Sequence, residues 1–312
     1  MSSRMTTFIS VIMRSGGLFA SLLAPHAAVT LLTTNQEHAA VIGAQGLTLV
    51  DLDGATRQLP VRVLTDPKDY GRRADLILVC TKTRATAAAA ATARGLLAED
   101  GLVLTLQNGL GNLEQLVVAV GANRAAAGVT SQAATLLAPG RVRHAGSGPT
   151  VLGRPAGRAG AVEAVAALFN RAGLDTRISD DVDSLLWSKL IVNVGINALT
   201  ALLRVPNGVL AQTPACDLLM TRAVDEAVAV ARSLHIDLDY ERQLERVREV
   251  CVRTADNRAS MLQDILRGRA TEIDAINGAV VACGRQAGVA TPVNLLLTQL
   301  VQALEATAAD RL

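Results

Sequence analysis

Aromatic residues are scarce in this chain of 312 residues, where they make up 2% of the sequence although hydrophobic residues make up 50%. The core must therefore be built from alanine, valine, leucine and isoleucine, which suits helices packed on a parallel sheet. A single core stops growing near roughly 250–300 residues, so a chain of this length fits two domains better than one.

Cysteine and histidine are also rare, with four of each in the chain. The cysteines lie far apart without a CxxC pair or a nearby histidine cluster, which argues against a zinc site or a disulfide scaffold. No G-x-S-x-G motif accompanies the histidines. We expect reduced thiols in a cytoplasmic protein, and no metal site. The cysteines are Cys80, Cys216, Cys251 and Cys283.

Acidic and basic residues are spread along the chain without runs of one sign, and the net charge is only +2. The chain thus lacks the electrostatic footprint of a nucleic-acid or membrane-surface protein. The apolar opening stretch could pass for a secretory signal, but Arg14 interrupts it and Val29–Leu32 continues it as a strand-like run. No other segment approaches the about 20 uninterrupted apolar residues of a membrane span. We expect a small-molecule partner, and neither nucleic acid nor membrane.

Short β-rich apolar runs occur at residues 8–12, 28–33, 75–81 and 101–106, and helical patterns separate most of them. Alanine is the best helix former, so the alanine-rich stretch 84–98 is expected to be a crossover helix. Continuous apolar strands that alternate with helices predict a mostly parallel sheet covered on both faces. The expected fold class is therefore α/β, with a doubly wound, Rossmann-type sheet.

The pattern changes after about residue 180. Residues 125–180 hold short strand candidates and one helix, whereas the rest of the chain shows long helices with almost no strand signal. We therefore predict a dinucleotide-binding domain over residues 1–180 and an all-helical domain over residues 181–312. The expected helices of the second domain are 183–203, 213–235, 239–254, 257–267, 272–288 and 292–308.

The turn after the first expected strand is the place where a dinucleotide-binding protein carries G-x-G-x-x-G. Here the sequence offers Ser15, Gly16 and Gly17 at the start of a helix of small residues. These residues suit a phosphate site, although an ordinary strand-to-helix turn explains them equally well. At the end of the second expected strand, an acidic residue would favour NAD and a basic residue would favour NADP. The sequence has Thr33 and Thr34 there, so this position does not choose between the two cofactors.

Lys189, Asn193 and Asn197 recur every four residues in an otherwise apolar segment, so on a helix they form one narrow polar stripe. A buried cation and two buried amides need partners, because an unpaired charge in the interior is very costly. Lysine is also rare in this arginine-rich chain, with three residues in all. A buried ammonium group can act as a general acid, which arginine cannot readily do. A solvent-facing stripe remains the alternative.

Three further residues, Lys82, Asn108 and Glu272, are candidates for the ligand-binding site because of their positions in the sequence. Lys82 and Asn108 each follow an expected strand, and the carboxyl ends of parallel strands line the ligand crevice of such folds. For Asn108, which precedes Gly109, an Asn-Gly turn is the simpler explanation. Glu272 follows Thr271, which resembles a helix N-cap, so a plain first-turn acid is its alternative role.

Taken together, these segments resemble the ketopantoate reductase (2-dehydropantoate 2-reductase) family, which reduces a branched 2-oxo acid with NADPH in pantothenate biosynthesis. The similar blocks run in the family's order and cover most of residues 75–297. The most specific combination is K-x-x-x-N-x-x-x-N with S-M-L-Q-D and T-E-I-D-x-I-N-G. The blocks are Leu76–Lys82, Leu106–Asn112, Trp187–Asn197, Val205–Gly208, Ser260–Ile265, Thr271–Gly278 and Gly288–Asn294.

The resemblance implies a role for each candidate residue. Lys189 would donate a proton to the ketone oxygen, and Glu272 would help to position substrate and cofactor. The substrate's hydroxyl and carboxylate groups would be held by Asn193, Asn197, Asn207 and Ser260. The cofactor would be bound by Ser15, Gly16, Gly17, Lys82, Asn108 and Ala134. The helical domain would resemble the C-terminal domain of 6-phosphogluconate dehydrogenase.

The sequence departs from the family in its cofactor half. The glycine turn is about three residues short, Met13 replaces the first glycine, and Thr34 matches the arginine that usually binds the 2′-phosphate. The expected cofactor is NADP, with NAD not excluded. A non-catalytic ligand-binding or sensor protein with impaired dinucleotide binding is the alternative function, and a reductase of another 2-oxo acid is a third. The apolar helical domain has the surface for a homodimer, but the sequence does not choose an oligomeric state.

Overall fold

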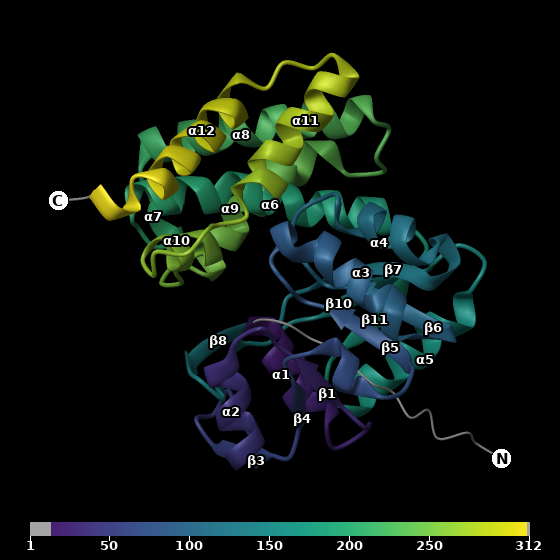
Figure 1. Cartoon of the computed structure of the whole chain (residues 1–312). Coiled ribbons are helices and arrows are strands. Elements are labelled where there is room, and N and C mark those ends of the chain that lie inside the picture. The colour runs from purple at the N-terminus through teal and green to yellow at the C-terminus, as the bar shows by residue number, and fades with distance from the viewer. Residues whose placement is uncertain (1–13, 311–312) are drawn as a thin grey trace. The chain divides into compact units, whose positions relative to one another are not determined.

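A computed structural model of the chain describes residues 14–310, so the expected first strand at 8–12 lies outside the described part (Figure 1). The chain folds into two compact units. The first comprises Met1–Gln107 and Asn112–Val182, and the second comprises Asn108–Gly111 and Asp183–Leu312. The short segment Asn108–Gly111 thus belongs to the second unit although both of its flanks belong to the first.

The first unit is built on a five-stranded sheet with the strand order β11-β10-β7-β6-β5. Its strand pairs are parallel except for β7 and β10, which are antiparallel. The mostly parallel sheet predicted from the alternating pattern is confirmed. The strands are β5 (Ala74–Val79), β6 (Leu97–Thr105), β7 (Ala125–Thr130), β10 (Thr150–Gly153) and β11 (Thr176–Ser179).

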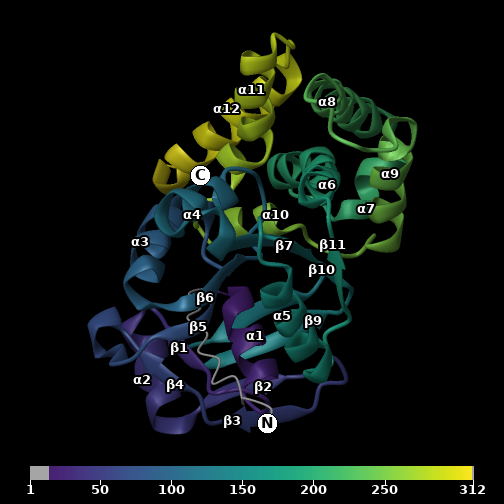
Figure 2. The ribbon, with the colours of Figure 1, turned by 90° about the vertical axis from the view of Figure 1, so that its right-hand side faces the viewer.

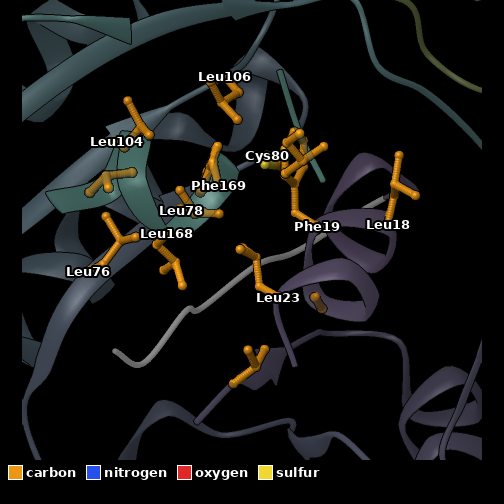
Figure 3. Close-up of a cluster of buried hydrophobic side chains, with 14 of the residues drawn as sticks. Leu18, Phe19, Leu23, Leu76, Leu78, Cys80, Leu104, Leu106, Leu168 and Phe169 are labelled. Atoms are coloured by element: carbon orange, nitrogen blue, oxygen red, sulfur yellow. The ribbon is translucent and has the colours of Figure 1, made fainter. Parts of the chain in front are cut away.

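Both faces of this sheet are covered, because successive side chains of a strand point to opposite faces. In β5, Leu76 and Leu78 pack in one cluster with α1 (Arg14–Leu23) and α5 (Ala159–Arg171) (Figure 3). The Phe19 and Phe169 rings stack there with centroids 5.6 Å apart. Ile77 and Val79 pack on the other face with α3 (Thr86–Leu96) and α4 (Asn112–Val120). This is the doubly wound arrangement expected for a continuous apolar strand.

Smaller sheets complete the first unit. One pairs β1 (Thr30–Leu32) with β4 (Arg62–Leu64) in parallel, and α2 (Gln36–Gln45) follows β1. The other has the order β3-β2-β9-β8. Of these strands only β1 and β9 overlap runs that the sequence predicted as strands, at 28–33 and Arg141–His144, because the others lack a clear alternation of polar and apolar residues. The four-stranded sheet comprises β2 (Leu47–Val50), β3 (Thr56–Leu59), β8 (Ala133–Ala138) and β9 (Arg141–Gly146).

The second unit is helical in its described residues, as expected (Figure 2). The expected helix 272–288 begins later, because residues Ile273–Ala275 form a 3-10 turn, η5. One short helix, α7, was not expected. The helices are α6 (Val182–Leu203), α7 (Asn207–Gln212), α8 (Pro214–Ser233), α9 (Gln243–Arg253), α10 (Ser260–Ile265), α11 (Asn277–Ala287) and α12 (Pro292–Ala306).

Helix α6 is the central helix of this unit. It is long and apolar enough to cross a membrane by length and composition, but most of that window is buried in the fold, as in a core helix. The packing is close at Gly195, where an added Cβ would lie 2.8 Å from Val247 of α9 and 3.0 Å from Val224 of α8. Glycine at this position therefore lets two helices approach α6 directly.

We expect Gly195→Ala to destabilise the helical unit by about 1–3 kcal/mol, the usual cost of overpacking a core. Gly278→Ala on α11 is the matched control, since its Cβ would make only ordinary contacts, the nearest at 3.4 Å. The measurement is urea-induced unfolding followed by circular dichroism. A variant at Gly195 as stable as the one at Gly278 would contradict the close packing of α6.

Candidate active site

The predicted polar stripe lies on α6 as one face of a continuous helix. Asn197 is only 5% exposed, and Lys189 and Asn193 are partly buried, so the alternative of a solvent-facing stripe is not supported. Burial lowers the pKa of the Lys189 ammonium group from its usual 10.5 to about 8, although the negative charge of Glu272 opposes this change. Lys189 can thus exchange its proton near neutral pH, as a general acid must.

Glu272 is held at the start of the η5 turn by neighbours on both sides. The Nδ2 atom of Asn108 donates a hydrogen bond to the Glu272 carboxylate at 3.4 Å. The hydroxyl of Thr271 accepts from the backbone N–H of Ile273 at 3.2 Å, a local turn contact, whereas the N-cap residue of η5 is Glu272 and not Thr271 as expected. The structure therefore brings three predicted residues, Lys189, Asn108 and Glu272, into one electrostatic group.

Asn207 begins α7, and its Nδ2 atom donates to the hydroxyl of Thr254 at 2.8 Å. Among the described residues, neither the Oδ1 atom of Asn207 nor the Nδ2 atom of Asn193 finds a hydrogen-bond partner, although both atoms are buried. An open buried donor and an open buried acceptor cost free energy unless a ligand or water satisfies them. Both amides therefore suit a polar ligand. Ser260, the first residue of α10, is exposed.

The expected cofactor residues lie in several elements of the first unit. Ser15 and Gly16 fall in the first turn of α1. A Cβ on Gly17 would lie 2.7 Å from Val142 of β9, so this glycine permits close helix–strand contact, as a fingerprint glycine does. Lys82 follows β5 and is partly buried.

Ala134 lies on β8, in the four-stranded sheet and not in the sheet that carries Lys82. At the end of β1, the side chain of Asn35 caps α2 by accepting from the N–H of His38 at 2.9 Å. That amide therefore has a structural role.

Within residues 14–310, no group of three or more His, Cys, Asp or Glu residues could hold a metal ion.

Sequence reasoning missed a buried polar network in the helical unit. The Glu226 carboxylate of α8 accepts the backbone N–H groups of Val293 and Asn294 at 2.8 and 2.9 Å, which caps the start of α12. Asn294 accepts from the Nδ2 atom of Asn277 at 2.9 Å, and that atom also donates to the carbonyl of Val194 on α6 at 3.4 Å. The network thus contacts the backbone of α6 at the residue after Asn193. Asn277 and Asn294 stood in the resembling blocks, but no pattern linked them to Glu226.

A Rossmann-type sheet followed by an all-helical unit with a buried lysine defines a class of two-domain, nicotinamide-dependent oxidoreductases. The chain belongs to the ketopantoate reductase family. The family described as ketopantoate reductase PanE/ApbA matches residues 15–157, and its C-terminal counterpart matches residues 181–305.

Individual relatives agree with this assignment. The chain is 42% identical to a 2-dehydropantoate 2-reductase of Halobacterium salinarum over 92% of its own length and 94% of the relative's. It is 34% identical to that of Pyrococcus abyssi, over 93% and 95% of the two chains.

Solved structures resemble the fold closely. A PanE/ApbA family ketopantoate reductase from Ralstonia eutropha has a TM-score of 0.89 at 31% identity, covering 97% of this chain and 100% of the other. D-mandelate dehydrogenase with NADH and anilino(oxo)acetate has a TM-score of 0.91 at 28% identity with the same coverage.

The buried ammonium group makes Lys189 costly to the fold. A pKa lowered from 10.5 to about 8 reduces the free energy of unfolding at neutral pH by about 3 kcal/mol. Because the unfolded chain binds this proton more tightly, stability rises with pH between about 8 and 10.5. We expect Lys189→Met to be more stable than the wild type at pH 7, by up to about 3 kcal/mol, and the difference to shrink toward pH 10.

Urea-induced unfolding at pH 7 and pH 10 measures both differences. Lys68→Met is the matched control, because Lys68 is exposed, and substitutions at exposed positions usually change stability by less than about 0.5 kcal/mol. A Lys189→Met protein less stable than the wild type at pH 7 would contradict the cost assigned to the buried charge.

Proposed function

We propose that this protein reduces ketopantoate or a similar small 2-oxo acid to the 2-hydroxy acid with a nicotinamide cofactor, as a 2-dehydropantoate 2-reductase in pantothenate biosynthesis. The observation that carries the proposal is Lys189, buried on α6 with its pKa lowered to about 8 beside the charge of Glu272. The relatives named 2-dehydropantoate 2-reductase support the reaction class.

The described residues divide the chemistry among themselves. When bound, the nicotinamide would supply a hydride to C2 of the oxo acid, and negative charge would then grow on the ketone oxygen. The Nζ atom of Lys189 would neutralise this charge and give its proton to the oxygen. Glu272 keeps the lysine protonated near neutral pH by raising its pKa, and Asn108 orients the carboxylate through its hydrogen bond.

The buried amides of α6 and α7 would bind the rest of the substrate. The open Nδ2 atom of Asn193 can donate to a carboxylate, and the open Oδ1 atom of Asn207 can accept from a hydroxyl group. Asn197 and Ser260 would add further polar contacts. A hydroxyl and a carboxylate are the polar groups that ketopantoate carries beside its ketone.

The cofactor we propose is NADPH. The residues that would hold it are Ser15, Gly16 and Gly17 at the start of α1, with Lys82, Asn108 and Ala134 toward the nicotinamide. The tight approach of Gly17 to Val142 fits a dinucleotide-binding turn. Two of the similar structures contain NADH, so a titration must compare both cofactors. An increase of the melting temperature with NADPH would also exclude the sensor alternative.

A second substrate class is favoured by the likeness to D-mandelate dehydrogenase, whose structure holds anilino(oxo)acetate. Activity on ketopantoate and on an aryl 2-oxo acid would separate the two. None of the four cysteines of the chain forms a disulfide, which supports a cytoplasmic location. The homodimer for which the apolar helical domain has the surface stays untested, because the sequence did not choose an oligomeric state.

We expect Lys189→Ala to lower kcat by about 10²–10⁴-fold, the usual loss when a general acid is removed. Glu272→Ala should lower kcat as well, because the lysine then loses the charge that keeps it protonated. Turnover is followed by NADPH absorbance with ketopantoate in excess. Near-wild-type rates in both variants would refute the assignment of roles.

The pH dependence of the two reaction directions tests the same roles. Because Lys189 must be protonated to donate, kcat/KM for reduction should be level below about pH 8 and fall above it, whereas oxidation of the 2-hydroxy acid should rise through the same range. Glu272→Gln removes the charge that raises the lysine pKa, so the alkaline limb should move to lower pH. A limb that moves upward, or does not move, would contradict the coupling of the two residues.

A further inference from the structure

The segment Asn108–Gly111 is tied at both ends to one buried hydroxyl group of the first unit. The chain leaves that unit after Gln107 and returns at Asn112. The Nε2 atom of Gln107 donates to the Thr86 hydroxyl at 2.8 Å, and the Thr86 hydroxyl donates to the Oδ1 atom of Asn112 at 2.8 Å. The exposed fractions of Thr86, Gln107 and Asn112 are 0%, 7% and 3%.

The direction of these hydrogen bonds is fixed by their neighbours. The Gln107 Nε2 atom also donates to the carbonyl of Thr81 at 2.9 Å, and its Oε1 atom accepts from the hydroxyl of Thr105 at 2.9 Å. A flipped amide would therefore face a carbonyl with its own oxygen. The Thr86 hydroxyl must accept from Gln107 and can give its single proton to Asn112. Buried hydrogen bonds with fixed directions favour one arrangement of the side chains that make them.

Thr86 and Asn112 are also the first residues of α3 and α4, which pack side by side on one face of the sheet (Figure 1). Gln107 follows the end of β6, which ends at Thr105. The three side chains therefore join two helix starts to one strand end. We call Thr86, Gln107 and Asn112 the anchor network.

The anchored segment lies closely against the turn that carries Glu272. The backbone N–H of Leu110 donates to the carbonyl of Ala275 at 3.2 Å. Gly109 has a φ of +82°, and an added Cβ would lie 2.4 Å from that same carbonyl oxygen. Asn108 donates to Glu272 from this segment. Only four residues separate the two anchored ends, so the position of Asn108 depends on where those ends are held.

We propose that the anchor network is a positioning set: it fixes the ends of Asn108–Gly111 and thereby holds the Asn108 amide on the Glu272 carboxylate. Thr86 is the residue on which it depends, because its hydroxyl joins Gln107 to Asn112. In this role the network acts through the position of Asn108, and not by binding substrate or cofactor itself. Its effect on turnover rests on the proposed function, whereas its effect on the segment does not.

Thr86→Val tests the proposal, since it keeps the shape of the side chain and removes the hydroxyl. We expect kcat/KM for ketopantoate to fall at least tenfold, with kcat affected more than the KM for NADPH. Thr86→Ser keeps the hydroxyl and should recover activity to within threefold of the wild type, even though it loses a buried methyl group. Failure of the serine variant to recover activity would show a packing role and overturn the proposal.

Thr150→Val in β10 is the matched control. Thr150 is also 0% exposed, and its hydroxyl shares a 2.8 Å hydrogen bond with that of Thr130, away from the anchor network. The substitution thus removes a comparable buried hydrogen bond from the same unit. Its kcat/KM should stay within twofold of the wild type whatever its melting temperature. A loss as large as that of Thr86→Val would mean that activity follows general stability and would overturn the proposal.

Hydrogen–deuterium exchange separates this proposal from the proposed function. Peptides covering residues 106–113 should exchange faster in Thr86→Val than in the wild type, Thr86→Ser or Thr150→Val. Unchanged exchange in Thr86→Val would overturn the anchor even in an active enzyme. A wild-type protein that reduces no 2-oxo acid would refute the proposed function, while faster exchange in Thr86→Val would still support the anchor.

Discussion

The helical unit must carry a positive charge in a mostly apolar interior, and much of its arrangement follows from that requirement. Lys189 lies on the central helix, which α8 and α9 approach closely at Gly195. A charge there is tolerable only with an acid nearby, and Glu272 supplies it from the turn before α11. The amides of Asn193 and Asn197 share the face of the helix that carries Lys189, and an amide can bind a polar ligand without adding charge.

Much of the fold was predictable from the periodicity of apolar residues and from the composition of the chain. The run Leu76–Val79 indicated a strand buried on both faces, and the structure places alternate residues of this strand in two separate clusters. Short strands such as β2 and β3 were missed, since a run of four residues is too short to show a clear periodic signal. The late start of α11 was missed because η5 has helix-forming residues and differs only in its backbone path.

The candidate site was predictable only in part. The spacing of Lys189, Asn193 and Asn197 placed them on one helix face, and the resemblance pointed to Glu272. The sequence did not show that Gln107 and Asn112 share one hydroxyl partner, because pairing between residues 21 and 26 positions apart leaves no local pattern. Such polar networks depend on tertiary geometry. The cofactor half was harder still, since part of its turn lies outside the described residues.

The scarcity of aromatic residues has one further consequence. Trp187 is the only tryptophan of the chain, is 4% exposed and lies on α6 two residues before Lys189. The intrinsic tryptophan emission of the unlabelled protein therefore comes from one buried indole on the same helix as the lysine. Reduced nicotinamide absorbs in the range where tryptophan emits, so the chain carries a single built-in optical reporter on the helix that we assign to catalysis.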